Sequence, residues 1–288
     1  MATVPINDPR SALVEELRTT GYAVLKPAAA RAALELDVAQ LDGLRASGER
    51  LPRDPYLRDG GRYRARRHSC FMHTPGTGQL AAVAQRAHWQ PTTYNALHGG
   101  MLRWFEPIEP AVAGAPAFRQ LLSSLGALFA QLQPVSRWHL EAHQFRIDTA
   151  GGIGRPTPEG AHRDGVDFVA VVLVRRHGVR GGETRVFEAH GSHGVRFTLE
   201  HPWTLLLMDD ARVIHETTPL QAQGAAGATD GATGQASSRE RAEPDRLSSV
   251  GCRKPAPTLY AIGSARGARP RDVRRACSDS GRPWRRAP

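Results

Sequence analysis

The chain has 288 residues, of which 40% are hydrophobic and 23% charged, a composition typical of a globular protein with a sizeable core. No stretch approaches 18 uninterrupted apolar residues, so we expect no membrane span. Residues 1–10 lack the pattern of a signal peptide. The three cysteines are widely spaced, which argues against a disulfide framework and against a cysteine zinc site. These features predict a cytoplasmic protein.

The formal net charge of +10 raises the question of a nucleic-acid partner. Residues 221–288 hold 13 Lys and Arg against 6 Asp and Glu, so most of the excess lies at the C-terminal end. A basic tail can attract polyanions without specificity. Because the remainder is nearly balanced, we expect neither a specific nucleic-acid partner nor a membrane partner.

The first half of the chain has mainly helical patterns. Asp8 and Pro9 resemble a helix N-cap followed by proline at the first helical position, and Gly21 ends that helix. A short apolar run then predicts a strand over 22–25. Further helices are predicted over 28–46, 79–87 and 116–133.

From residue 138 onward the apolar pattern shortens to that of strands. The run over 166–174 is rich in valine, as expected of a strand buried on both faces. Helices followed by short strands and turns predict an α+β jelly roll with the helices packed on one side. The other predicted strands cover 138–147, 183–187, 195–199, 204–208 and 212–214.

This organisation ends near residue 220. Only seven large apolar side chains occur among residues 221–288, too few to offset the entropy of ordering the chain. We therefore divide the protein into a jelly-roll domain over 1–220 and a low-complexity basic tail over 221–288, which we expect to be disordered or aberrant.

One pattern indicates a metal centre. His162 and Asp164 are two positions apart, so on an extended backbone both side chains point to the same face. His215 follows Asp164 by 51 residues, after several predicted strands. Two imidazoles and one carboxylate on one face of an iron ion leave three positions open, as oxygen chemistry requires.

The spacing of His162, Asp164 and His215 also has an explanation that involves no metal. A chain with 12 histidines can contain such a pattern by chance, on a surface turn. The context favours the metal, because His162 and Asp164 precede an apolar strand and His215 ends another. Both strand ends would then face one mouth of the barrel, where pockets usually lie.

The segment 156–165, Pro-Thr-Pro-Glu-Gly-Ala-His-Arg-Asp-Gly, resembles the signature of the bacterial Fe(II)/2-oxoglutarate dioxygenases that hydroxylate free L-amino acids, the L-isoleucine dioxygenase family. The similarity extends over roughly residues 20–220. Further segments that resemble this family are 94–103, 105–107, 143–147, 181–184, 208–215 and 218–219.

The resemblance implies a double-stranded β-helix with His162, Asp164 and His215 as ligands of Fe(II). It also implies 2-oxoglutarate and O2 as co-substrates, with 2-oxoglutarate decarboxylated to succinate. The expected substrate is a free aliphatic L-amino acid or a close relative, which is hydroxylated at a carbon or, alternatively, oxidised at sulfur. An alternative is a catalytically impaired relative that binds a metal or small molecule without turnover, and a third reading is a basic nucleic-acid-binding protein.

The chain departs from the family after the second histidine. The superfamily usually has an arginine shortly after that histidine, which pairs with the distal carboxylate of 2-oxoglutarate. Here the similar Arg-Asp-Val begins at Arg271, 56 residues after His215, and no apolar strand follows. An insertion over about 224–268 and a reading-frame change after Gln221 both explain this. Each predicts that the last barrel strand is missing or displaced, with Arg271 as candidate anchor.

An amino-acid substrate needs partners for both of its charges. Arg103 and Arg146 are candidates for its carboxylate, and Glu159, next to the metal motif, for its amino group. Structural salt bridges and a turn-capping role are the competing explanations. His143 is interpreted as a core histidine. The arginines within 63–67 are interpreted as a solvated face or loop.

Overall fold

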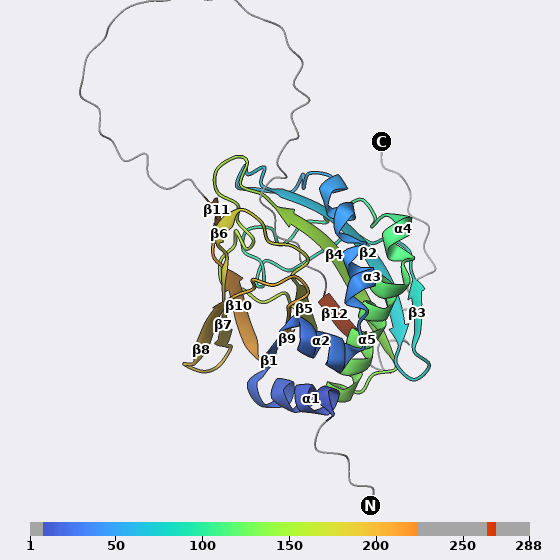
Figure 1. Ribbon diagram of the computed structural model, residues 1–288. Coiled ribbons are helices and arrows are strands. Elements are labelled where there is room, and N and C mark those ends of the chain that lie inside the picture. The colour runs from blue at the N-terminus through green and yellow to red at the C-terminus, as the bar shows by residue number, and fades with distance from the viewer. Residues whose placement is uncertain (1–7, 224–263, 269–288) are drawn as a thin grey trace, which may run out of the picture.

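The computed structural model describes residues 8–223 and 264–268, and it combines helices with antiparallel sheets (Figure 1). The larger sheet has seven strands, and all of its neighbouring strands are antiparallel. In spatial order its strands are β1 (Tyr22–Leu25), β9 (Leu205–Asp209), β5 (Phe168–Val172), β12 (Ser264–Ala268), β4 (Arg137–Ile147), β2 (Arg64–Thr74) and β3 (Gln79–Ala82).

Two smaller antiparallel sheets accompany the large one. One has the order β10 (Val213–Thr217), β7 (Glu183–Glu188) and β8 (Gly194–Thr198), and the other pairs β11 (Leu220–Ala222) with β6 (Val179–Gly181). This mixture of helices and antiparallel sheets is consistent with the expected jelly roll.

The helices gather on one side of the large sheet (Figure 1). One continuous hydrophobic core joins their apolar side chains to those of the sheet, including Leu121 and Phe129 with Trp138 and Phe168. No helix of the described residues is long and apolar enough to cross a membrane. The helical elements are α1 (Pro9–Thr20), α2 (Pro27–Leu34), α3 (Val38–Asp42), the 3-10 helix η1 (Arg45–Arg50), α4 (Pro110–Ala113) and α5 (Pro116–Leu132).

Helix α1 forms as its sequence predicts. The Asp8 side chain accepts hydrogen bonds from the first backbone N–H groups, and Pro9 stands at the first helical position. Gly21 ends the helix with φ 81°, a conformation that glycine adopts at low cost. The cap and the apolar stripe of α1 thus bring the chain directly into β1.

Two of the expected helices are wrong. The range 28–46 does not form one helix, because α2 ends at Leu34 and the next residue, Glu35, has a φ of 54° that reverses the backbone before α3 begins. The range 79–87 contains strand β3 instead of a helix. Residues 75–78 form a turn that folds β3 back onto β2, and cross-strand pairing outweighs the local helical preference.

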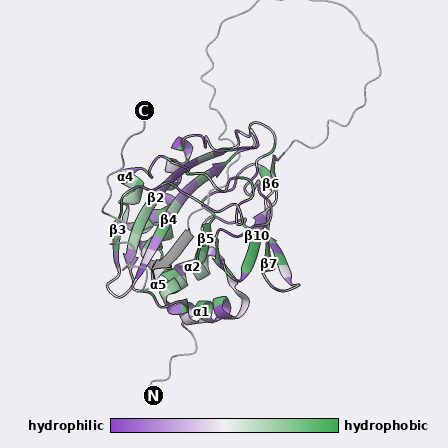
Figure 2. Ribbon diagram, turned by 180° about the vertical axis from the view of Figure 1, so that it is seen from behind, coloured by the Kyte–Doolittle hydropathy of each residue, from purple (hydrophilic) through white to green (hydrophobic). Residues whose placement is uncertain are grey.

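The arginine-rich segment 63–67 also differs from expectation. Arg64 and Arg66 lie in β2, and both are buried rather than solvated. Hydrophilic residues run along much of β2 and β4, whereas β5 and α5 are mainly hydrophobic (Figure 2). The large sheet therefore carries a polar region on two neighbouring strands.

Strand β12 comes from the range expected to be a tail. Its backbone lies between β5 and β4, and Arg266 is opposite His139 in the β12–β4 register. The large sheet is thus continuous from β1 to β3 through a strand distant in sequence. The division at residue 220 stays a prediction, and Arg271 lies outside the described residues.

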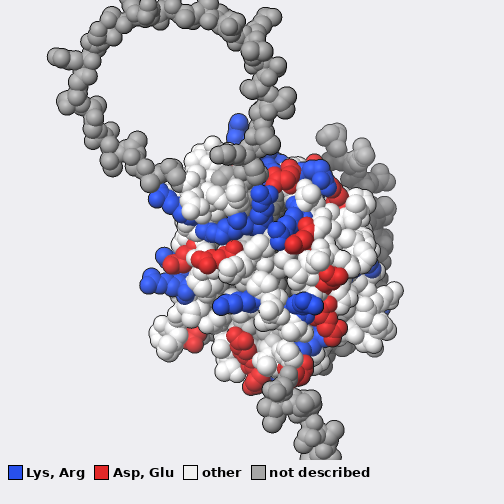
Figure 3. All heavy atoms as spheres, in the orientation of Figure 1, with Lys and Arg blue, Asp and Glu red and all other residues white. Residues whose placement is uncertain are grey.

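The charges of the folded part are mixed in sign. Basic side chains gather in a band across the face shown in Figure 3, and acidic side chains lie among them. This interleaving agrees with the nearly balanced charge of residues 1–220.

Candidate metal centre and substrate cavity

The backbones of His162 and His215 lie directly opposite each other. His162 belongs to the loop between β4 and β5, and His215 belongs to β10. Each residue donates its backbone N–H to the carbonyl of the other, at 3.0 and 2.9 Å. The two imidazole centroids are consequently 4.5 Å apart.

Asp164 completes this group. Its Oδ1 is 3.7 Å from Nε2 of His162, and its Oδ2 is 3.9 Å from Nε2 of His215. One potential ligand atom from each of the three residues lies within 4.8 Å of the others. The structure therefore brings together the three residues that the sequence predicted as metal ligands.

The hydrogen bonds of the imidazoles suit a metal ion. Nδ1 of His162 is 2.9 Å from the carbonyl of Gly160, which can only accept, so Nδ1 donates there and Nε2 is the nitrogen left to bind a metal. Nδ1 of His215 is buried and has no hydrogen-bond partner among the described residues. Two imidazole nitrogens, a carboxylate and no thiolate form a donor set that fits Fe(II).

The electrostatics of the three residues are coupled. Burial opposes the charge of His162, but the hydrogen bond and charge of Asp164 outweigh burial and raise the pKa of His162 to about 9. Burial also opposes the Asp164 charge, yet the two histidines hold the pKa of this carboxyl well below its usual range. Burial lowers the pKa of His215 to about 4. Asp164 is thus an anion ready to receive a cation.

Gln90, a residue outside the motif, positions the side chain of Asp164. Gln90 donates from Nε2 to Oδ1 of Asp164 at 3.0 Å. Oε1 of Gln90 accepts from Arg103 at 2.8 Å and from Asn95 at 3.1 Å. Sequence reasoning did not identify Gln90, because it lies 74 residues before Asp164 and no local pattern links them.

One cavity contains this centre together with buried charges of both signs. Arg64, Arg66 and Arg103 line it, as do Glu141 and Glu159. Arg103 and Glu159, two of the candidate substrate residues, therefore both line this cavity. Glu159 accepts a hydrogen bond from Asn95 at 3.3 Å and lies 3.5 Å from Nε2 of His162.

Arg146 is placed differently. It does not line the cavity. Instead its guanidinium contacts the carbonyls of Gly48 and Glu49, at 3.4 and 3.0 Å. The structure thus separates Arg146 from the cavity, while Arg103 remains a candidate.

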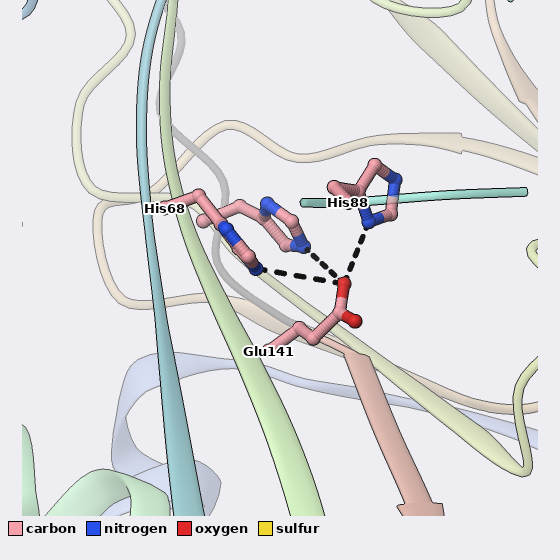
Figure 4. A group of neighbouring side chains, drawn as sticks. His68, His88 and Glu141 are labelled. Carbon is pink, nitrogen blue, oxygen red and sulfur yellow. Dashed lines mark hydrogen bonds and ion pairs between the residues drawn. The ribbon is translucent and has the colours of Figure 1, made fainter. Parts of the chain in front are cut away.

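A second cluster of ligand-type side chains was not predicted. His68, His88 and His143 surround the carboxylate of Glu141 (Figure 4). His143 is buried, as expected for a core residue, but it lines the cavity as well. The signal available in the sequence was the alternation of His139, Glu141 and His143, which places three polar residues on one face of a strand.

Comparisons with known proteins agree with this geometry. The family model described as 2OG-Fe dioxygenase matches residues 45–231, and the chain therefore belongs to the 2OG-Fe dioxygenase family. A search of curated proteins found no significant match.

Similarity to solved structures agrees with the family match. A bsmA homolog from Methylobium petroleophilum PM1 is 49% identical, with a TM-score of 0.75, and the match covers 90% of this chain and 93% of that one. IDO from Bacillus thuringiensis is 15% identical with a TM-score of 0.65, covering 90% and 99% of the two chains. The Fe(II)/α-ketoglutarate-dependent dioxygenase TqaL is 17% identical with a TM-score of 0.58, covering 91% of each. The latter two matches support the fold.

Membership of the family defines the chemistry. The protein is a non-haem iron dioxygenase that uses Fe(II), 2-oxoglutarate and O2. Its substrate is a small molecule.

Proposed function

We propose that this dioxygenase hydroxylates a free aliphatic L-amino acid, with 2-oxoglutarate decarboxylated to succinate. The supporting observation is the lining of the cavity, where guanidinium and carboxylate groups stand beside the metal-ligand triad. An amino acid carries both a carboxylate and an ammonium group. A cavity with buried charges of both signs complements such a zwitterion.

His162, Asp164 and His215 are proposed to hold the iron. The bound iron supplies the activation of O2, with 2-oxoglutarate as the reductant. The three residues keep their donor atoms on one side, which leaves the opposite side open for co-substrate. The paired backbones of His162 and His215 fix two of the ligands before the metal binds.

Arg103 is proposed to bind the carboxylate of the substrate. Its side chain is buried, and Gln90 fixes it through one hydrogen bond. Nε of Arg103 has no hydrogen-bond partner among the described residues. A buried guanidinium with an unpaired donor gains from a carboxylate partner. Glu159, which the sequence suggested for the amino group, also lines this cavity.

A panel of L-amino acids tests this function. Fe(II), 2-oxoglutarate and the protein are incubated with each amino acid, and succinate and the hydroxylated product are quantified. We expect aliphatic amino acids to give both products in equal amounts. Absence of coupled product from every amino acid would refute the substrate class.

The ligand assignment is tested separately. His162→Ala is expected to abolish high-affinity Fe(II) binding in anaerobic titrations and to abolish succinate release. His193→Ala is a matched control, because His193 is 86% exposed in its side chain and lies outside the cavity. Retained turnover in His162→Ala would contradict the assignment.

A further inference from the structure

Glu141 lies on β4 with three imidazoles directed at one of its oxygens (Figure 4). Oε2 is 2.6 Å from Nδ1 of His88, 3.5 Å from Nε2 of His68 and 3.6 Å from Nε2 of His143. Oε1 has no such contact with the residues drawn. One oxygen is therefore held by the protein, while the other remains available.

The neighbours of these imidazoles fix where their protons lie. Nη2 of Arg66 is 2.7 Å from Nδ1 of His143. A guanidinium can only donate, so Nδ1 of His143 accepts and Nε2 carries the proton toward Glu141. The Gln85 amide nitrogen, which donates to the carbonyl of His68 at 2.9 Å, lies 3.3 Å from Nδ1 of His68. His68 is therefore expected to present Nε2–H to Glu141 as well.

This arrangement does not suit one metal ion bound by all four residues. The rings of His68 and His143 are stacked, with centroids 4.5 Å apart and an angle of 19° between their planes. An imidazole-bound metal lies close to the ring plane at about 2.1 Å from the nitrogen. Because the ring planes of His68 and His143 are nearly parallel and separate, one ion cannot lie close to both planes at that distance. Arg66 would also place an unfavourable positive charge beside the ion.

The cluster instead keeps Glu141 ionised and keeps His88 and His143 neutral. Burial would raise the pKa of Glu141, but the three imidazoles outweigh burial and hold this pKa far below its usual range. Burial lowers the pKa of His88 to about 4 and that of His143 well below its usual value. Arg66, held between the rings of Phe105 and Phe145 at 4.1 and 4.4 Å, supplies a fixed charge behind His143.

We propose that Glu141 is the ammonium-binding residue of the cavity, receiving the α-amino group of the substrate on Oε1. This inference rests on the proposed amino-acid substrate and assigns the second of its two charges. Glu141 lines the cavity with its side chain one-third exposed. The carboxylate is desolvated on one side and restrained by three donors, so an ammonium partner requires little further reorganisation.

Glu159 is the less suitable of the two carboxylates. Its Oε1 is 3.5 Å from Nε2 of His162. A metal about 2.1 Å from that nitrogen would therefore lie close to Glu159. An ammonium group bound there would occupy the space that 2-oxoglutarate and O2 need. Glu141 belongs to a separate group of side chains within the same cavity.

The test compares an amino acid with its des-amino analogue, the carboxylic acid of the same skeleton. The amino acid is the one that gives most succinate in the panel. Anaerobic calorimetry with 2-oxoglutarate and Co(II) measures affinity, and initial rates give kcat and KM. Wild-type protein is expected to bind the amino acid roughly 10- to 100-fold more tightly than the analogue, the range for a hydrogen bond to a charged group.

Glu141→Gln retains the shape of the side chain and removes its charge. We expect this variant to lose most of the preference for the amino acid through KM, with a smaller change in kcat. Glu159→Gln, the matched comparison, is expected to keep the preference. Thermal unfolding and circular dichroism establish that each variant is folded, and Glu141→Asp should recover part of the preference because it restores the charge.

Three results would overturn the assignment. One is wild-type protein that binds amino acid and analogue equally, a result independent of any variant. Another is an unchanged preference in folded Glu141→Gln. The third is binding of a second equivalent of Zn(II) per chain that is retained in His162→Ala and lost in Glu141→Gln. Such binding would show that the cluster around Glu141 is a metal site. If no amino acid is turned over, the proposed function and the assignment of Glu141 are both wrong. If amino acids are turned over but Glu141→Gln keeps the preference, only the assignment of Glu141 is wrong.

Discussion

The carboxylate of Asp210 holds the backbone at Asp164. Its Oδ1 accepts the N–H of Asp164 at 2.8 Å, and its Oδ2 accepts those of Gly165 and Val166 at 2.7 and 3.1 Å. Asp210 is almost completely buried and does not line the cavity. It therefore acts on the metal centre through the backbone of a ligand.

Asp210→Asn should weaken metal binding without removing a ligand. The amide retains one acceptor oxygen, but its NH2 group would face backbone N–H donors. We expect the Kd for Fe(II) or Co(II) to rise about 10- to 100-fold, as for other changes to groups that orient metal ligands. We also expect the free energy of unfolding to fall by about 1–3 kcal/mol. Anaerobic titration and chemical denaturation measure the two effects.

Asp209→Asn is the matched control for this variant. Asp209 precedes Asp210, and its side chain accepts a hydrogen bond from the nearby N–H of Ala211 instead of from the backbone at Asp164. Metal affinity should therefore remain close to that of the wild type. An equal loss in both variants would mean that the position of Asp164 does not depend on the Asp210 carboxylate.

Local patterns in the sequence sufficed for part of the fold and site. The cap at Asp8 and the alternation over 138–147 predicted α1 and β4 because both signals are contained within a few residues. The two-residue spacing of His162 and Asp164 likewise indicated a shared face. The approach of His215 was suggested only by its place at a strand end and by the family resemblance.

Features that depend on distant partners were missed. Arg64 and Arg66 appeared solvated, since arginine is buried only where partners compensate its charge. Here Asp54 pairs with Arg64 at 2.7 Å, and aromatic rings enclose Arg66. The cluster at Glu141 escaped prediction for the same reason, because its histidines come from β2, β4 and a separate loop.

The backbone register of β12 leads to a prediction for 2-oxoglutarate binding. Arg266 is opposite His139, a residue that lines the cavity. We therefore expect Arg266→Ala to raise the Kd for 2-oxoglutarate roughly 10- to 100-fold through loss of a charged partner.

Arg271→Ala provides the comparison for Arg266→Ala, because the family resemblance favoured Arg271 as the anchor. Isothermal titration with 2-oxoglutarate under anaerobic conditions, in the presence of Co(II), distinguishes the two. A large loss in Arg271→Ala with none in Arg266→Ala would restore the expectation from sequence.

Acidification should destabilise the protein through His88. Burial lowers the pKa of His88 from its ordinary value of 6.5 to about 4 in the folded state, so the unfolded chain binds more protons between these values. The stability from this residue is present above about pH 6.5 and is lost as the pH falls toward 4. The loss between pH 7 and pH 5 is at most about 2 kcal/mol.

Chemical denaturation across this range, with His88→Asn beside the wild type, measures the contribution. The asparagine amide can still donate to Glu141 but does not titrate, so the dependence on pH should become shallower. His193→Asn should leave it unchanged, since His193 is largely exposed. Identical slopes for wild type and His88→Asn would contradict the prediction.

Gly165 adjoins the proposed metal ligand Asp164 at a position where a larger residue would be strained. Its φ is 74°, and an added Cβ would lie 2.5 Å from Cδ2 of Tyr94. Gly160 has a similar φ of 79°, but nothing lies within 4 Å of its added Cβ.

Gly160→Ala should therefore cost about 1 kcal/mol of unfolding free energy, the penalty for the left-handed backbone alone. Gly165→Ala should cost about 1–3 kcal/mol more, because Tyr94 must move, and should also weaken Co(II) binding. Denaturation and metal titration of both variants test this, and equal losses would indicate that Tyr94 yields without cost.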